Sequence, residues 1–139
     1  MRNTLLRRAK GEKVIFLDDD NVLTPIAFLT YLKHMGCEML IARIDTTRAF
    51  DQPFLPVDLP GKSLVRQGNI DPLCLCLSRE LVCVRCRGWE SKAGYEADFL
   101  NILHFGVGHA LCKRRVTSSE SMMRVMVLTP KDVTFVRSN

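Results

Sequence analysis

Residues 14–21 read Val-Ile-Phe-Leu-Asp-Asp-Asp-Asn, so an apolar run passes directly into three carboxylates. A short run that is fully apolar is typical of a strand buried on both faces of an α/β sheet. The carboxylates follow the end of this strand, and open α/β sheets bind ligands outside the carboxyl ends of their strands. The stretch therefore predicts both an α/β fold class and the position of a ligand site.

The carboxylates of this stretch indicate a cation site. Asp18, Asp19 and Asp20 repel one another, so leaving them unpaired costs free energy unless something positive is bound. Ligand sets made only of oxygen suit a hard cation such as Mg²⁺ or Mn²⁺. We expect Asp18 and Asp20 to be the metal ligands. The alternative is an exposed acidic turn that helps to cap the helix after it.

A helix is predicted directly after the acidic stretch. Thr24 has the side chain of an N-cap, and Pro25 fits the first helical position. Gly36 is suited to the end of this helix. Its apolar side chains share one broad face, formed by Ile26, Leu29, Leu32 and Met35.

The other elements complete a single α/β domain over residues 1–139. Apolar patterns predict helices at residues 3–10 and 97–105, strands at 38–44, 69–77 and 122–128, and a short helical turn at 78–80. The candidates for the buried side of the later helix are Phe99, Ile102, Leu103 and Phe105. Residues 45–67 hold three prolines and predict a long loop, which in a compact domain is usually functional or mobile.

Composition indicates an ordinary globular domain with a basic surface. Of the 139 residues, 47% are apolar and 25% are charged, which is the usual balance for such a domain. No apolar run approaches the roughly 20 residues that cross a bilayer, and residues 1–10 are too basic for a signal peptide. We therefore expect a cytoplasmic protein, with peripheral contact at the cytosolic face of a membrane as an alternative.

The net charge of +5 raises the question of a nucleic-acid partner. The basic clusters are Arg7-Arg8, Arg85 with Arg87, and Lys113-Arg114-Arg115. These clusters lack the interleaved aromatic residues on which bases stack, which argues against nucleic acid. The phosphates of a nucleotide, or an anionic membrane surface, would use the same charge equally well.

Two classes of enzyme use an acidic stretch in this position. Haloacid-dehalogenase-like phosphohydrolases use the first aspartate as a nucleophile and the third as an acid/base, roles that Asp18 and Asp20 match. Residues 44–47 imitate the downstream strand-end Thr of these enzymes. GT-A glycosyltransferases instead use a DXD site, whose carboxylates hold a metal against a nucleoside diphosphate. The acidic stretch alone leaves both alternatives open.

Two further segments, taken with the acidic stretch, resemble family-2-like glycosyltransferases with the GT-A fold. Residues 9–21, Ala-Lys-Gly-Glu-Lys-Val-Ile-Phe-Leu-Asp-Asp-Asp-Asn, resemble the segment leading into the DXD site. Residues 68–71 (Gly-Asn-Ile-Asp) and 78–81 (Ser-Arg-Glu-Leu) resemble the acceptor-side segment, and Trp89 with residues 94–99 (Gly-Tyr-Glu-Ala-Asp-Phe) resembles the segment with the catalytic carboxylate. The agreement in order and spacing runs from about residue 2 to about residue 105. It implies an incomplete GT-A-type mixed sheet flanked by helices.

The resemblance implies a nucleotide-sugar donor and a role for each donor-side residue. Asp18 and Asp20 match the outer aspartates of the DXD site, which bind Mn²⁺ or Mg²⁺ and the diphosphate. Asp19 is implied to contact the sugar or the ribose, and Asn21 completes the donor side. The implied reaction transfers the sugar to an acceptor hydroxyl and inverts its anomeric centre.

The resemblance leaves two candidates, Asp98 and Glu96, for the base that takes the acceptor's proton. Relatives often carry adjacent Glu-Asp here, whereas Ala97 separates the two carboxylates in this sequence. Positions two apart on a helix point about 200° apart, so only one can face the site. If the helix begins at Ala97, Asp98 lies in its first turn, where the helix dipole favours a carboxylate. We expect Asp98 to be the base and Glu96 to hold acceptor hydroxyls or backbone.

The acceptor side is implied to consist of Asn69, Asp71, Trp89 and Tyr95, with a sugar, a lipid or a protein as the acceptor. Trp89 is predicted either to form a platform for the acceptor or to pack in the core. The relatives begin with a strand-helix-strand region that grips the nucleoside, which precedes the start of this sequence. A complementing N-terminal half or a homo-oligomer is therefore an expected partner. A non-catalytic binding module with the same fold is the alternative.

Overall fold

Helices and strands mix along the chain in the computed structural model, which describes residues 2–48, 51–90, 96–115, 125–127 and 135–137, with side chains as far as Val107. The described α-helices are α1 (Arg2–Arg8), α2 (Pro25–Lys33) and α3 (Ala97–Arg115). A 3₁₀ turn, η1 (Pro72–Cys74), and a π-helical segment, η2 (Glu80–Arg85), lie between the strands and α3. The predicted mixed α/β class is confirmed.

Four of the described strands form one mixed sheet in the order β1-β6-β3-β7. Strand β6 (Leu75–Ser78) runs antiparallel to β1 (Lys13–Ile15) and to β3 (Met39–Ile41), while β3 runs parallel to β7 (Val125–Val127). Two small antiparallel pairs join β2 (Asn21–Leu23) to β8 (Phe135–Arg137) and β4 (Ile44–Asp45) to β5 (Phe54–Leu55). The strands are short, so caps and side-chain clamps matter as much as the sheet for placing functional residues.

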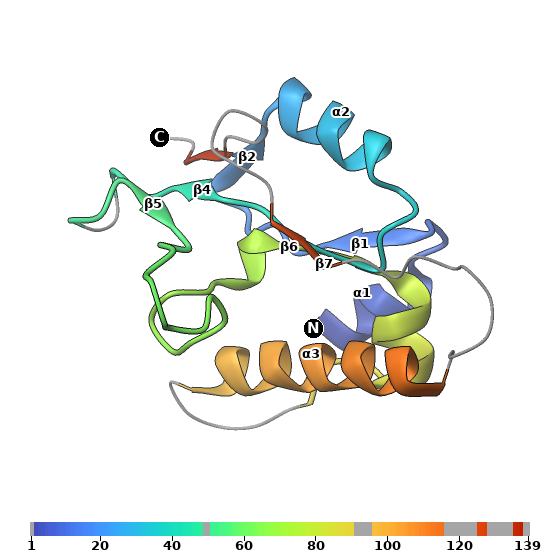
Figure 1. Cartoon of the computed structure of the whole chain (residues 1–139). Helices are drawn as coiled ribbons and strands as arrows, with labels where there is room; N and C mark the ends of the chain where they lie inside the picture. The colour runs from blue at the N-terminus through green and yellow to red at the C-terminus, as the bar shows by residue number, and fades with distance from the viewer. Residues whose placement is uncertain (1, 49–50, 91–95, 116–124, 128–134, 138–139) are drawn as a thin grey trace.

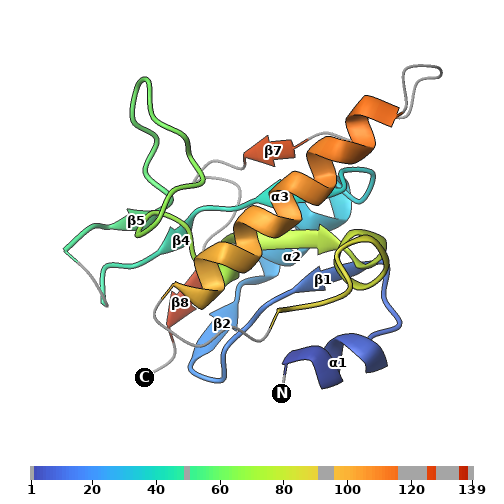
Figure 2. The ribbon, with the colours of Figure 1, turned by 90° about the horizontal axis from the view of Figure 1, so that it is seen from below.

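The mixed sheet lies between helices. Helix α2 covers one face, while α1 and α3 lie on the other side, as Figure 1 and Figure 2 show. Leu75 and Leu77 of β6 and Ile102 and Phe105 of α3 are fully buried. Burying a large apolar side chain contributes about 1.5–3 kcal/mol. This packing fixes α3, and with it Asp98, relative to the sheet.

Strand β1 is shorter and less buried than predicted. It ends at Ile15, and within it only Val14 is buried. Phe16 and Leu17 leave the sheet and line a surface cavity, and Leu17 is 45% exposed. The expectation of a strand buried on both faces is therefore wrong, because Ile15 and Phe16 are half-buried and all four residues of the apolar run line the cavity.

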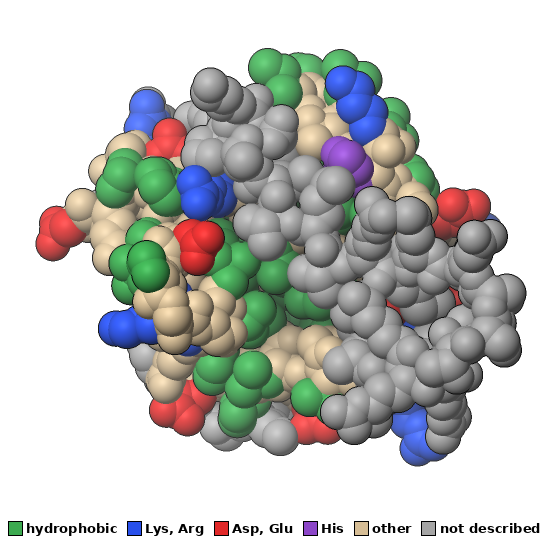
Figure 3. All heavy atoms as spheres, viewed as in Figure 1, with side chains coloured by type: hydrophobic (Ala, Val, Ile, Leu, Met, Phe, Trp, Pro, Cys, Tyr) green, Lys and Arg blue, Asp and Glu red, His purple; other side chains and the backbone are tan. Residues whose placement is uncertain are grey.

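Helix α2 begins where predicted but buries a different face. The Ala27 N–H donates to the Thr24 hydroxyl at 3.2 Å, which confirms the N-cap, and Pro25 is the first helical residue. The buried side chains of the helix are Ala27, Thr30 and Tyr31. The predicted broad face points outward instead: Ile26 is 61%, Leu29 57% and Leu32 49% exposed, and Met35 is half-buried. Figure 3 shows hydrophobic side chains on the surface along this helix.

The strand predicted at residues 69–77 forms only in its second half. Asp71 accepts a hydrogen bond from the Leu73 N–H at 2.9 Å and caps η1. Pro72 has no N–H for a strand ladder, which suits a turn at this point. Strand β6 therefore begins at Leu75, and Asp71 lies outside the sheet at its end. Ser78 then accepts from the Leu81 N–H at 3.1 Å as the predicted helical turn becomes η2.

The predictions of a loop at residues 45–67 and of a helix at residues 97–105 are partly right. Residues 45–67, predicted as a loop, contain β5 and the end of β4. Helix α3 forms as predicted but continues to Arg115. Of its predicted buried residues, Ile102 and Phe105 are fully buried and Phe99 is half-buried, whereas Leu103 is 38% exposed. Among the described helices, none has the length and apolar character needed to cross a bilayer.

Candidate functional site

The acidic stretch forms the turn between β1 and β2. The Asn21 N–H donates to the Asp18 carbonyl oxygen at 3.2 Å, and the Asn21 side-chain amide donates to the Asp20 carboxylate at 2.7 Å. Asp18 and Asp19 are exposed, whereas Asp20 is half-buried. The turn therefore presents Asp18 and Asp19 to solvent and holds Asp20 beside Asn21.

A cavity of about 470 Å³ lies next to this turn. Among the described residues that line it, the polar ones are Arg2, Asp18 and Asp19, and the rest of the wall is apolar and comes from α1, β1 and the residues just beyond them. Its volume is in the range of small-molecule sites. We call it the Asp18 cavity.

A metal ion at the acidic turn would need ligands in addition to the side chains of the turn. Among the described residues, no three His, Cys, Asp or Glu side chains are grouped closely enough to hold a metal ion by themselves. Mg²⁺, however, is usually bound through one or two carboxylates together with substrate phosphates and water. Asp18 and Asp20 supply carboxylate oxygens from one short turn, and a diphosphate would supply further oxygen ligands.

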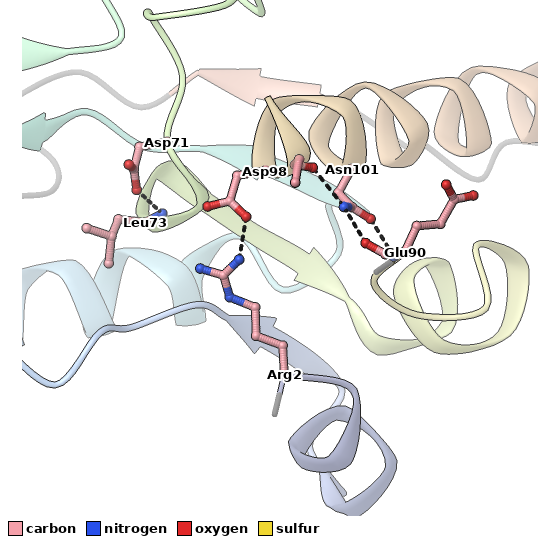
Figure 4. A network of polar contacts seen from close by, with 7 residues as sticks. Arg2, Asp71, Leu73, Glu90, Asp98 and Asn101 are labelled. Atoms are coloured by element: carbon pink, nitrogen blue, oxygen red, sulfur yellow. Dashed lines mark hydrogen bonds and ion pairs between the residues drawn. The ribbon is translucent and has the colours of Figure 1, made fainter. Parts of the chain in front are cut away.

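Asp98 lies in the first turn of α3, which begins at Ala97. Its carboxylate pairs with the Arg2 guanidinium, with 2.5 Å between Nη1 and Oδ1. The same guanidinium lies over the Trp89 ring, 4.6 Å from the ring centroid, as in a cation–π contact. Figure 4 shows Arg2 and Asp98 pointing toward each other, with Asp71 on the neighbouring turn. Arg2 therefore links α1 to the predicted base.

Asp71 brings another carboxylate to the same place. Burial raises the pKa of its carboxyl group, the hydrogen bond from the Leu73 N–H lowers it, and the negative charges of Asp18 and Asp98 raise it again. The positive charge of Arg2 acts in the opposite direction on the Asp71 pKa. Arg2 lines one cavity with Asp18 and pairs with Asp98, and Asp98 lines a second cavity with Asp71, although these residues lie far apart in the sequence.

Asn3 fixes α1 to the segment that carries Trp89. Its side-chain oxygen accepts from the Trp89 N–H at 2.7 Å, and its amide donates to the Trp89 carbonyl oxygen at 2.6 Å. Gly88 has a φ of +91°, and a Cβ there would lie 2.8 Å from the Asn3 side-chain oxygen. Glycine is the residue that tolerates both this backbone and this contact. The clamp holds Arg2, the neighbour of Asn3, at the site.

Asn101 makes a second clamp from α3. Its side-chain oxygen accepts from the Glu90 N–H at 2.6 Å, and its amide donates to the carbonyl oxygens of Glu90 at 3.0 Å and Ala97 at 2.8 Å. Asn101 is 1% exposed, so these bonds satisfy a buried amide that would otherwise be costly. They fix the first turn of α3 and so the backbone of Asp98 (Figure 4).

Trp89 lies beneath the site. It is 8% exposed and packs edge-on against Phe16 and Phe105, with ring centroids 4.9 Å and 5.5 Å away. The Arg2 guanidinium covers its ring. This burial supports the packing role for Trp89 over an open platform for the acceptor.

The other predicted acceptor residues differ in their positions. Asn69 is 4% exposed, and its side chain bonds to the backbone of Val57 and Leu64 and to Arg66. These contacts give Asn69 the structural task of holding the preceding loop. Tyr95 lies outside the described residues. Among the predicted acceptor residues that the structure describes, Asp71 has its carboxylate next to Asp98.

A second cavity, of about 520 Å³, lies beside Asp71 and Asp98. Its described lining comprises Gln52, Leu55, Gln67, Gly68, Ile70, Asp71, Pro72, Asp98 and Phe99. We call it the Asp71 cavity. Glu96 is exposed and accepts a hydrogen bond from the Gln67 amide at 2.9 Å. The cavity therefore places Asp98 in its wall and ties Glu96 to another of its residues.

Arg2 and Gln67 contribute to the site, although no sequence motif singled them out. Neighbouring carboxylates in a partly buried place need a positive partner, but no sequence signal shows that Arg2, 96 positions from Asp98, is that partner. Gln67 has no such signal, since its partner Glu96 lies 29 positions further along the chain.

The raised pKa of Asp71 predicts a pH-dependent cost to stability. Its folded-state pKa lies above the ordinary 3.8, so the folded state binds the proton more tightly than the unfolded state does. This tighter proton binding stabilises the folded state below pH 3.8, and the stabilisation is lost as the pH rises through the folded-state pKa. Asp71→Asn keeps an oxygen for the Leu73 N–H and removes the buried charge. In urea titrations at pH 7, we expect Asp71→Asn to have a higher free energy of unfolding than wild type. The difference between the two proteins should shrink as the pH is lowered toward 4. A difference that stays constant with pH would contradict this.

No family model matches this chain, and neither a curated protein nor a solved structure does.

Proposed function

We propose that this chain is a glycosyltransferase that moves a sugar from a nucleoside-diphosphate donor to an acceptor hydroxyl. The observation that supports it most is the Arg2–Asp98 ion pair, because Arg2 lines the cavity of Asp18 and Asp98 lines the cavity of Asp71. These carboxylates come from the three segments whose order resembles a GT-A enzyme. The order of the segments after residue 68 favours glycosyl transfer over a phosphohydrolase centred on Asp18 and Asp20.

In the proposed reaction Asp98 is the general base. The acceptor oxygen forms a bond to the anomeric carbon while its proton passes to the Asp98 carboxylate. The bond between the anomeric carbon and the diphosphate oxygen breaks, and its electron pair leaves with the nucleoside diphosphate. One displacement of this kind inverts the anomeric centre. Arg2 positions the Asp98 carboxylate before the acceptor arrives.

The donor belongs on the side of the acidic turn. Asp18 and Asp20 would hold the metal, which as a Lewis acid offsets the negative charge of the diphosphate. Asp19 is exposed at the Asp18 cavity, where its carboxylate is able to accept a hydrogen bond from a sugar or ribose hydroxyl. Donor and acceptor thus have one cavity each, with the Arg2–Asp98 pair joining the two walls.

Calorimetry with Mn²⁺ and nucleoside diphosphates tests the donor site. Titration of Mn²⁺ with UDP or GDP into wild type should give measurable binding. Asp20→Ala should weaken it by about 10–100-fold or more, the scale on which losing groups around a metal affects its binding. Asp58→Asn, which removes an exposed carboxylate elsewhere, is the matched control and should bind like wild type.

Other outcomes identify other functions. Equal binding by wild type and Asp20→Ala would show that the donor does not bind at the acidic turn. A phosphoaspartate at Asp18, trapped with a phosphate donor or beryllofluoride and detected by mass spectrometry, would identify the phosphohydrolase instead. Binding of the nucleotide without turnover of any nucleotide sugar would identify a non-catalytic binding module.

A further inference from the structure

The walls of the Asp71 cavity have a composition that restricts what can bind there. The polar groups are the amides of Gln52 and Gln67 and the carboxylates of Asp71 and Asp98. Apolar surface comes from residues such as Phe99. Amides and carboxylates both bond to hydroxyl groups, and the ring of a phenylalanine suits the C–H face of a sugar. A volume of about 520 Å³ is in the range of small-molecule sites.

The charge of this cavity is opposite in sign to that of the whole chain. The chain carries a net charge of +5, but the charged residues in the described lining of the cavity are Asp71 and Asp98. Arg2, which reaches Asp98 from the other side, is already engaged in the ion pair and over Trp89. An anionic group in the cavity would therefore face two carboxylates, and like charges brought together disfavour binding.

The Asp71 carboxylate has bonding capacity left for a ligand. One of its oxygens, Oδ1, accepts from the Leu73 N–H. An ionised carboxylate has about four lone-pair sites on two oxygens, so Oδ2 remains able to accept from a hydroxyl. The cap of η1 thereby fixes the direction of the acceptor group.

We propose that the Asp71 cavity binds a neutral, polyhydroxylated acceptor, such as a sugar unit, and discriminates against acceptors that carry a phosphate at this position. This inference rests on the proposed glycosyl transfer and adds the chemical class of the acceptor. Gln67 and Asp71 bind its hydroxyl groups, while Asp98 takes the proton of the attacking one. A sugar unit is chosen over a lipid phosphate because the cavity offers hydroxyl-binding groups and no described cation in its lining.

NMR titration of the full chain tests this inference. The probes are glucose, galactose and N-acetylglucosamine, each paired with its phosphate ester at the primary hydroxyl. We expect at least one neutral sugar to shift the amide signals of Gly68, Ile70 and Phe99, and to bind about tenfold or more tightly than its phosphate ester. Tighter binding of the phosphate esters would overturn the inference, and so would shifts confined to other parts of the chain or no binding by any sugar.

Two variants show whether the named residues are responsible. Gln67→Ala should weaken the binding of the neutral sugar, because the substitution removes a hydroxyl-binding amide. Asp71→Asn keeps a hydroxyl acceptor but removes a charge, so it should narrow the difference between a sugar and its phosphate ester. Asp58→Asn is an exposed control that should change neither. An unchanged difference in Asp71→Asn would show that the charge of Asp71 does not set the preference.

The result separates this inference from the proposed function. If Mn²⁺ and a nucleoside diphosphate bind at the acidic turn but the neutral sugars do not bind, the acceptor class is wrong and glycosyl transfer survives. If the sugars bind in the Asp71 cavity while the nucleotide does not bind, the cavity is a sugar site and glycosyl transfer fails.

Discussion

Asp98→Asn is expected to lower turnover by about 10²-fold or more, because general-base catalysis contributes on this scale. The variant keeps the shape of the side chain and removes its ability to take the acceptor's proton. Asp98 is 46% exposed and lies in the wall of the Asp71 cavity, so an acceptor hydroxyl has access to it. The measurement is the rate of sugar transfer from a nucleotide sugar that the wild-type chain turns over.

Glu96→Gln is the matched control for this experiment. Glu96 is also exposed, but it is tied to Gln67 at 2.9 Å, which suits a role in holding the acceptor. We expect it to raise the KM for the acceptor with little change in kcat. The opposite pattern, in which Glu96→Gln abolishes transfer and Asp98→Asn spares it, would make Glu96 the base.

Local chemistry made the start of α2 predictable from the sequence. The Thr24 cap and Pro25 at the start of α2 involve residues within one turn of each other, and both are confirmed. The buried face of α2 was not predictable, because its apolar residues outnumber those that the sheet can cover. Ala27 and Tyr31 are buried while Leu29 is 57% exposed, so tertiary packing decides the orientation of the helix.

The residues of the candidate site also fall into those that the sequence named and those that only the fold brings together. The carboxylates of Asp18 and Asp98 stand in segments with a recognisable order, so the sequence was enough to name them. Arg2 was not predictable, because it lies 96 positions from Asp98. The Asn3 clamp on Trp89 spans 86 positions and likewise depends on the fold. Contacts of this kind decide which predicted residues reach the site, and they placed Asp71 there and turned Asn69 toward the preceding loop.

Substitution in the aromatic packing beneath the site should lower the stability of the fold strongly. Phe105 is fully buried, its ring stacks with Phe16 at a centroid distance of 6.5 Å, and it contacts Trp89 edge-on at 5.5 Å. Phe105→Ala removes both ring contacts and leaves a cavity, so we expect the free energy of unfolding to fall by about 3–5 kcal/mol. Urea denaturation measures this loss.

Val107→Ala provides the control in the same helix, because Val107 is 56% exposed and its truncation should change stability by no more than about 0.5 kcal/mol. A loss of 3–5 kcal/mol is a large part of the 5–15 kcal/mol that stabilises a typical domain, so Phe105→Ala is expected to be marginally folded at about 25 °C. Phe105→Leu retains most of the volume and keeps the test quantitative if the alanine variant does not fold. Its loss should fall between those of the other two variants. Similar losses for Phe105→Ala and Val107→Ala would mean that the aromatic cluster of Phe16, Trp89 and Phe105 does not hold α3 against the sheet.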